Sequence, residues 1–450
     1  VEHKLGMHAS PTCTMTMGDH GGAVGYLIGE ENRGMLCMFT MMNQARLGVG
    51  LEGVGIADRA YQQALAFAQE RKQGRAVGKK GDGLDPIIVH PDVRRMLMLM
   101  KSQAEAMRAL AYTTAAAMDF AQRHPDKELR KRHQAFVDLM IPVVKGWCTE
   151  TGIEVASLGV QVHGGMGFIE ETGAAQHYRD ARITSIYEGT NGIQSIDLVT
   201  RKLAANGGAS VWALLDELGG IVKQVEASND PAFGTTGAKL RDALGSLERA
   251  SKWLLERVAS APNDALAGAT PYLRLFGSTL GGCMLAGEAL AAKSNGDAGD
   301  PQRYVTVARF FAENITVQAG SLEKTVTDSA DAVNGADAVL LIVAAASVAA
   351  WSLAYPQSSL TATLVRAVAD CAAVTTLGLA GVPMLEALGT VQGVLSNRLL
   401  SRAIGQVQIR VREGKGMARP LSDSGLFPAL ALNMIAVGEE TGRLEGMLSE

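Results

Sequence analysis

A 3.6-residue repeat of apolar side chains, running from Met35 to about residue 330, constrains the fold of this chain more than any other feature. Apolar residues recur at positions i, i+3, i+4 and i+7 over 51–75, 91–123 and 129–164, which lines them along one face of a helix. Alanine, leucine, valine and methionine carry the apolar content, and aromatic residues make up only 5%. This balance favours helices over β-sandwiches. We therefore predict a mainly α-helical fold in which long helices form a bundle.

The first 40 residues have a different pattern. Apolar and polar residues alternate loosely over 12–17 and 23–28, and each run ends at a glycine or at Asp19. Alternation with a period of two is typical of half-buried strands. We predict two or three short β-strands within residues 1–40, followed by a turn at 29–34 that leads into the first helix.

Clusters of glycine, asparagine and proline divide the rest of the chain. Asn206-Gly207-Gly208 predicts a linker between a first helical domain, 41–205, and a helical extension, 206–335. A loop is predicted at 294–301, where asparagine, glycine, aspartate and proline occur together.

An uncharged stretch, 338–355, lies within residues 336–358 and ends before Pro356. A helix needs about 20 apolar residues to span a membrane, and this stretch is slightly shorter and rich in alanine. The pattern leaves two alternatives open, a membrane-spanning helix and a helix buried in the protein. Residues 359–450 contain short helical patterns separated by glycine and proline, which predict a second, small helical bundle.

Charge and cysteine content exclude several classes of function. The formal net charge of -4 gives no basic surface, so no nucleic-acid partner is expected. The five cysteines are scattered without a CxxC pair, which predicts reduced thiols in a cytoplasmic protein and no metal site. The chain begins at Val1 with neither an initiator methionine nor a signal peptide, and we expect it to be a fragment.

One carboxylate, Glu188, lies in a glycine-containing turn between the apolar stretch 183–187 and a predicted helix start at Asn191. Asn191 and Gln194 have the spacing of a capping box, in which each side chain bonds a free N–H at the helix start. A carboxylate on such a turn can point into a pocket and act as a general base. A solvated carboxylate beside a helix start is the alternative.

Three other places have the residue types of a ligand site. The segment 161–168 is rich in glycine, which lets backbone approach a ligand closely. The segment 70–75 carries cations that could bind a pyrophosphate. A loop at a helix end and a solvated helix terminus are the respective alternatives. Arg46 lies on an otherwise apolar helix start, where a buried guanidinium needs an anionic partner, either a carboxylate or a ligand.

Four segments, in the order that the family has them, closely resemble the sequence signature of acyl-CoA dehydrogenases: 70–75, 161–168, 178–183 and 187–194. The resemblance covers residues 1–335. It implies that residues 1–40 are a remnant of the family's middle β-domain and that 41–205 are its C-terminal helical domain. Residues 206–335 are similar to the C-terminal extension of the longer members.

The resemblance implies an enzyme that binds FAD and oxidises an acyl-CoA thioester to its trans-2-enoyl-CoA. Glu188 would take the α-proton while the β-hydrogen leaves as hydride to the flavin. The family's thioester carbonyl is held by the backbone N–H of the base and by a flavin ribitol hydroxyl, which stabilises the developing enolate.

Further roles follow from the same resemblance, residue by residue. FAD contacts are implied for Arg71, Gln161, Gly164, Gly165, Thr190, Asn191 and Gln194. Substrate contacts are implied for Asn43, Arg46, Tyr187 and Gly189. Arg71 and Gln161 would reach FAD across a dimer interface, because members of the family are commonly dimers or tetramers. An electron-transfer acceptor would be a further partner.

The resemblance also places a helical domain and most of a β-domain ahead of the position of Val1. In the family these parts surround much of the flavin. We therefore expect a truncated chain that binds FAD poorly and has impaired activity.

The last part of the chain is similar to the F-domain of platform proteins of type II secretion and type IV pilus systems, over the segments 377–388, 425–428 and 434–444. This resemblance spans 359–450 and implies a helical domain attached to the inner membrane, with 338–355 as the preceding span. Because the two families are unrelated, we expect a chimera joined near residue 340. An inner-membrane platform protein is the alternative function.

Overall fold

Two compact units make up the chain in the computed structural model, residues 1–334 and residues 335–450. The structure describes residues 1–80, 82–295, 299–336, 392, 398–413 and 418–423. The uncharged stretch at 338–355 and most of the predicted second bundle therefore lie outside the described residues.

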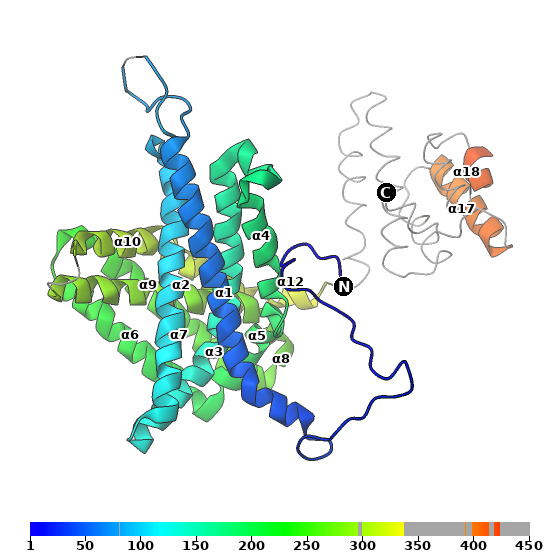
Figure 1. The fold of residues 1–450 in the computed structure, drawn as a ribbon, viewed down its shortest axis with the longest axis horizontal. Helices are drawn as coiled ribbons and strands as arrows, with labels where there is room; N and C mark the ends of the chain where they lie inside the picture. Colours follow the sequence, from blue (N-terminus) through cyan, green and yellow to red (C-terminus); the bar gives the residue numbers. More distant parts are fainter. Residues whose placement is uncertain (81, 296–298, 337–391, 393–397, 414–417, 424–450) are drawn as a thin grey trace. The chain divides into compact units, whose positions relative to one another are not determined.

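Three long helices form the first part of the unit 1–334 (Figure 1). They are α1 (Gly34–Glu70), α2 (Pro91–Arg123) and α3 (Lys127–His163), and they pack side by side. Pro91 opens α2, where its missing N–H would have no partner in any case. Asp126 caps α3 by accepting hydrogen bonds from the N–H groups of Glu128 and Leu129. The predicted mainly helical fold is confirmed.

Glycine lets α1 and α3 approach each other backbone to backbone. A Cβ at Gly53 would lie 2.6 Å from the Cys148 carbonyl oxygen, and one at Gly152 would lie 2.9 Å from the Gly53 carbonyl oxygen. These distances leave no room for a side chain. The crossing sets the spacing of the two helices that flank the turn at Glu188.

Short helical elements connect α3 to the predicted linker. In chain order they are η2 (Gly164–Phe168), η3 (Glu170–Thr172), α4 (Ala174–Arg182), η4 (Ile183–Ser185), α5 (Asn191–Asp197), η5 (Leu198–Leu203) and η6 (Ala205–Gly208). Asn206, Gly207 and Gly208 have φ values of 51°, 65° and 85°. These left-handed residues interrupt the helical path at the predicted linker.

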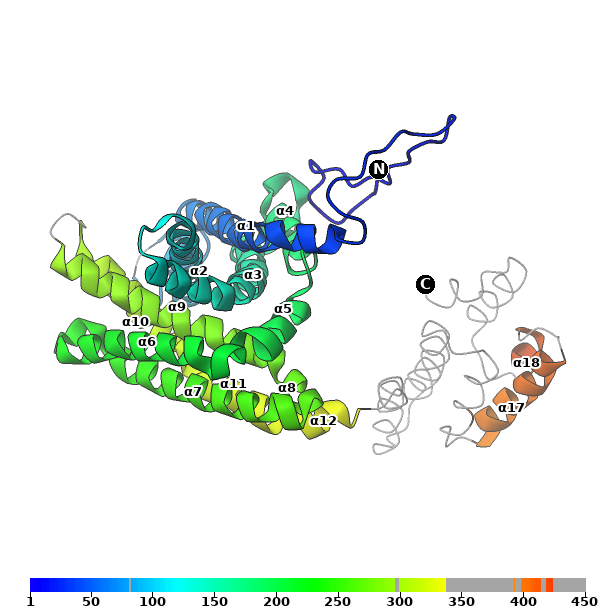
Figure 2. The ribbon, with the colours of Figure 1, turned by 90° about the horizontal axis from the view of Figure 1, so that it is seen from below.

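The helical extension packs against the three long helices within the same unit (Figure 2). Its elements are α6 (Ala209–Ala227), η7 (Pro231–Phe233), α7 (Thr236–Ser260), α8 (Pro262–Ala267), α9 (Ala269–Ser294), α10 (Pro301–Asn314), η8 (Thr316–Gln318), α11 (Ala319–Asp328) and α12 (Ala330–Asn334). Gly277 of α9 lies so close to Trp147 of α3 that a Cβ would be 2.2 Å from the indole ring.

One helix among the described residues, α9, is long and apolar enough to cross a membrane by length and composition. Most of its apolar stretch is buried within the bundle, and Tyr272, Phe276 and Leu280 are fully buried there. The helix therefore serves as a core helix of this unit.

The predicted β-strands at the N-terminus do not form in the structure. Residues 1–33 contain neither strand nor helix, and Met15, Met17 and Tyr26 are exposed. A strand needs a neighbour for its backbone N–H and C=O groups, and the described part of the chain offers this segment none. The backbone N–H of Met7 donates to the Asp180 carboxylate at 2.7 Å, which ties the segment to α4.

In the unit 335–450, the described residues form α17 (Arg398–Arg412) and α18 (Ala418–Asp423). Ile404, Val407 and Leu421 are buried, so both helices contribute apolar side chains to a core. The small helical bundle stays a prediction, because most of residues 359–450 lie outside the described part of the chain.

Candidate functional site

The turn between η4 and α5 holds Glu188 in an unusual backbone conformation. Glu188 has a φ of 55° and Gly189 a φ of 85°, so two successive residues lie in the left-handed region, which is unfavourable for a residue with a Cβ. The Glu188 carbonyl oxygen accepts hydrogen bonds from Gln194 Nε2 at 3.3 Å and from Arg46 Nε at 3.4 Å. These donors stabilise the turn, and Glu188 itself is half-buried.

The helix α5 begins at Asn191, as predicted, but the residue that caps it is Thr190. The Thr190 hydroxyl accepts a hydrogen bond from the Ile193 N–H at 3.4 Å. The predicted capping box is wrong because both of its side chains bond elsewhere. Asn191 bonds to α3, and Gln194 bonds to the carbonyl group of Glu188.

Asn191 fixes the start of α5 to one face of α3. Its Oδ1 accepts hydrogen bonds from Lys145 Nζ and from the Thr149 hydroxyl, both at 3.1 Å. Its Nδ2 donates to the Gly146 carbonyl oxygen at 3.2 Å and to the Glu150 carboxylate at 3.0 Å. The side chain faces the interior in this structure.

Lys145 was not among the predicted site residues, although it is completely buried beside the turn. Burial and, to a smaller extent, the Arg46 guanidinium lower the pKa of Lys145 to about 8, while the Glu188 and Glu150 carboxylates oppose this shift. The available signal in the sequence was one cation inside the apolar run 139–148. Below pH 8 the buried side chain is mainly an ammonium.

Arg46 has the anionic partner that its burial requires. Its Nη1 lies 3.6 Å from the Asp197 carboxylate, and both side chains are almost fully buried. Asp197 also accepts a hydrogen bond from Arg201 Nε at 2.5 Å. The partner of Arg46 in this structure is therefore a carboxylate of the chain itself, at the end of α5.

Two other predicted substrate residues lie on or against α1. The Tyr187 hydroxyl donates to the Glu52 carboxylate. Burial, and then this hydrogen bond, raise the pKa of Tyr187 above its ordinary value, so the phenol remains protonated. Asn43 lies one helical turn before Arg46, on the same side of α1, and is half-buried.

The other predicted cofactor residues lie at the far ends of α1 and α3. Arg71 is exposed and follows the last residue of α1, roughly 37 Å along the helix from Arg46 at 1.5 Å per residue. Gln161, Gly164 and Gly165 are exposed where α3 ends. One copy of the chain therefore does not bring these residues into the site around Glu188.

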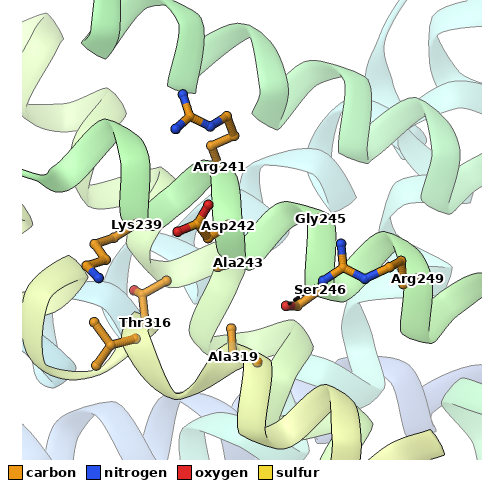
Figure 3. A pocket seen from close by; sticks show the side chains of 11 residues that line it. Lys239, Arg241, Asp242, Ala243, Gly245, Ser246, Arg249, Thr316 and Ala319 are labelled. Carbon is orange, nitrogen blue, oxygen red and sulfur yellow. Dashed lines mark hydrogen bonds between the residues drawn. The ribbon is translucent and has the colours of Figure 1, made fainter.

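A cavity of about 420 Å³ lies in the extension, between α7 and the segment of η8 and α11 (Figure 3). Lys239, Asp242 and Arg249 are among the residues that line it. Arg249 is bonded to the Glu323 carboxylate through contacts of 2.6 Å. None of the predicted site residues lines this cavity. Within the described residues, no cluster of His, Cys, Asp and Glu could hold a metal ion.

Comparison with known families assigns both parts of the chain. Residues 32–203 match the family model described as acyl-CoA dehydrogenase, C-terminal domain, and residues 214–337 match acetyl-CoA dehydrogenase C-terminal like. Residues 371–450 match type II secretion system (T2SS), protein F.

Individual relatives agree with the first of these assignments. The chain is 43% identical over 335 residues to 3-methylmercaptopropionyl-CoA dehydrogenase of Ruegeria pomeroyi, which covers 74% of this chain and 56% of that protein. It is 34% identical over 333 residues to the broad-specificity linear acyl-CoA dehydrogenase FadE5 of Mycobacterium tuberculosis, over 70% of this chain and 54% of that protein. The chain thus spans about half the length of the curated relatives it matches.

A solved structure shares the fold of the first unit. Caenorhabditis elegans ACDH-11, in complex with C11-CoA, aligns with a TM-score of 0.54 and 19% identity, over 68% of this chain and 49% of that chain.

Proposed function

Residues 32–337 of this chain belong to the acyl-CoA dehydrogenase family, and we propose that Glu188 is the base that removes the α-proton of an acyl-CoA thioester in an FAD-dependent dehydrogenation. The observation that carries the proposal is the Glu188 turn, a half-buried carboxylate on a left-handed backbone held by two internal donors. Strained backbone of this kind is concentrated at functional sites, where a reacting group must be held in one place.

The α-CH of a thioester is a weak acid, so a carboxylate removes its proton only if the charge on the developing enolate is stabilised. The backbone N–H of Glu188 is the donor that this chain would offer to the thioester carbonyl. Its orientation depends on the same left-handed turn that aims the carboxylate. One conformation of the turn would therefore orient both the Glu188 carboxylate and the backbone N–H that stabilises the enolate.

The residues present fit an FAD cofactor. A Cβ at Gly164 or Gly165 would meet nothing within 4 Å, so the backbone there is open to a ligand. Gln194 Oε1 is buried beside the turn and has no hydrogen-bond partner among the residues that the structure describes, and it could accept a hydrogen bond from the cofactor. Arg71 is an exposed cation suited to a pyrophosphate. When bound, FAD would supply the acceptor for the hydride from the substrate β-carbon. The other proposed contacts are Gln161, Thr190 and Asn191.

The proposed assembly is a homo-oligomer, since Arg71, Gln161, Gly164 and Gly165 lie at the far ends of α1 and α3 and outside the site around Glu188 within one copy. A second copy would bring them to the site. We assign substrate contacts to Asn43, Arg46, Tyr187 and Gly189, and an electron-transfer acceptor would reoxidise the cofactor.

The test is to purify the full chain with added FAD and to record flavin absorbance before and after adding butyryl-CoA or a longer acyl-CoA. We expect weak flavin binding, because the chain spans about half the length of its relatives, and bleaching of the flavin that does bind. Glu188→Gln keeps the side-chain size, so it should bind flavin equally while bleaching slows by about 10²–10⁴-fold. Unchanged bleaching in that variant rules out Glu188 as the base, and a chain that binds no flavin has no such activity.

The match of residues 371–450 favours a second candidate function, an inner-membrane platform protein of a type II secretion or type IV pilus system. We infer that the chain is a chimera joined near residue 340, because the families on either side have no shared chemistry. Extraction of membranes at high pH separates the two localisations. A platform protein stays with the lipid, whereas a cytoplasmic dehydrogenase does not. A peptide across residue 340, detected in the cells of origin by mass spectrometry, would show that the fusion is natural.

A further inference from the structure

We propose that Lys145 is a positioning residue for the Glu188 turn, because its buried side chain anchors the start of α5 to α3 through the Asn191 amide. The functional meaning of this anchor rests on the proposed role of Glu188 as a base. The contact itself, and the experiment that tests it, depend on neither cofactor nor substrate.

The anchor is built on one face of α3. Lys145, Gly146, Thr149 and Glu150 lie at positions i, i+1, i+4 and i+5, which is the spacing of neighbours on a helix surface. All of them bond the Asn191 side chain. An amide of this kind has no further donor hydrogen to give, so its orientation is fully determined.

Lys145 is the donor on which this arrangement depends. Thr149 has a single hydroxyl hydrogen, and its shortest contact is with the Lys145 carbonyl oxygen, at 2.7 Å, rather than with Asn191 Oδ1, at 3.1 Å. The ammonium has three hydrogens, and it can give one to Asn191 Oδ1 without competition. Without Lys145, Asn191 Oδ1 would lose the donor whose hydrogen is not shared with another acceptor.

Charged groups of three elements face Lys145, namely Arg46 of α1, Glu150 of α3 and Glu188 of the turn. The two carboxylates attract the ammonium and the guanidinium repels it. A deprotonated lysine still has two N–H groups, so the hydrogen bond to Asn191 persists in both protonation states. The hydrogen bond between Lys145 and Asn191 should therefore persist over the pH range in which the Lys145 ammonium loses its proton.

The turn is held from its other side as well. Gln194 and Arg46 bond the Glu188 carbonyl oxygen, while Asn191 bonds α3. Behind them, α3 lies close both to α9 of the extension and to α5, since a Cβ at Gly146 would lie 2.7 Å from Leu273 and 3.5 Å from Gln194 Cβ. The start of α5 is thus bonded from two sides, and Lys145 and Arg46 are the buried cations among its partners.

The experiment measures hydrogen–deuterium exchange of the full chain without cofactor or substrate. The reporters are the Ile193 and Gln194 amides, which bond to Thr190 at the start of α5. Lys145→Met removes the donor at similar size and Lys145→Arg keeps a donor. Asn191→Ala removes the acceptor together with the two amide hydrogens that bond Gly146 and Glu150. The control is Lys101→Met, because Lys101 is a lysine of α2 whose ammonium contacts Glu105 and the Tyr61 ring rather than Asn191.

We expect Lys145→Met and Asn191→Ala each to accelerate exchange at these amides by about 10-fold or more, with no change in Lys101→Met. The double variant should exchange no faster than Asn191→Ala alone, and Lys145→Arg should restore most of the protection. Wild-type exchange in Lys145→Met, fully additive effects, or a failure of arginine to rescue would each overturn the proposal. If Lys145→Met does not fold, Asn191→Ala tests the same bond with Lys145 intact.

A second measurement separates positioning from general stability. In chains saturated with FAD, Lys145→Met should slow bleaching by acyl-CoA by about 10-fold or more, and Lys145→Arg should restore most of the rate. Bleaching at the wild-type rate in Lys145→Met, or a loss that arginine does not restore, would contradict a positioning role. If the wild-type chain binds no flavin, the proposed function fails while the exchange result still decides the anchor.

Discussion

With a φ of 55°, Glu188 lies in the left-handed backbone region. This conformation is unfavourable by roughly 1–2 kcal/mol for a residue with a Cβ. The surrounding donors stabilise the turn, as expected where a side chain must point in one direction. At the scale of a single residue, the backbone conformation of Glu188 therefore lowers the free energy of unfolding.

This conflict gives a first prediction. Glu188→Asn should raise the free energy of unfolding by on the order of 1 kcal/mol, because asparagine adopts the left-handed region more readily than glutamate. Urea denaturation of the full chain measures the change, with Glu188→Gln as the control that leaves the strain in place. If the two variants are equally stable, the turn is not strained in solution.

Lys145 gives a second prediction at this scale. Its pKa is lowered from 10.5 to about 8 by burial, so the unfolded state binds a proton more tightly than the folded state. The contribution of this group to the free energy of unfolding should therefore increase as the pH rises from about 8 to 10.5. It should be lost again as the pH falls from 10.5 to about 8.

Wild type should gain about 2 kcal/mol relative to Lys145→Met between pH 7.5 and pH 10. Urea denaturation at both pH values measures this difference, in which the titration of other groups cancels. A constant difference would show that Lys145 is not buried as the structure has it.

At the scale of the helices, the contact of α9 with α3 depends on a glycine. Gly277 accommodates the Trp147 ring at a distance that no side chain could tolerate. This contact joins the extension to the helix that carries Lys145. We therefore expect the geometry of the site to depend on α9 as well as on α3.

Gly277→Ala should destabilise the protein by about 1–3 kcal/mol, since the overpacked methyl group outweighs the better helix propensity of alanine. Gly287→Ala on the same helix is the matched control, because its Cβ would be 3.5 Å from Ile221, an ordinary contact. That control should be neutral or more stable by about 0.5–1 kcal/mol. Thermal unfolding compares the two, and equal effects would contradict the close crossing.

At the scale of the whole molecule, the chain divides at residue 334 into two compact units. The large apolar core of the first unit is built from residues between Leu47 and Val326. The families matched by the two parts are unrelated, which is consistent with units that fold separately.

Removal of residues 335–450 should therefore change the Tm of the first unit by less than about 2 °C. Removal of residues 319–450 is the control, because α11 contributes the buried Ala319 and Val326 to the core, and it should lower the Tm clearly. Differential scanning calorimetry measures both. A large shift in the first case would show that the second unit stabilises the first.

Local signals predicted the bounds of α2 and, within two residues, those of α3, but not the bounds of α1. Periodicity and a proline at position 91 act within a few residues, and α2 spans 91–123 as predicted, whereas α1 spans 34–70 and the periodic stretch covers 51–75. Alternation at 12–17 is equally local, but a strand also needs a neighbour, so the predicted strands did not form.

By itself, the sequence determined the helical class, the family and the place of Glu188 on a turn before a helix. Only the tertiary structure decided the partners of that turn. Lys145 lies 46 residues from Asn191, and Arg46 lies 142 residues from Glu188. Such pairs arise from the packing of distant helices, and a buried polar group bonds whatever that packing brings within reach. Local sequence patterns, which span only a few residues, therefore cannot predict these contacts.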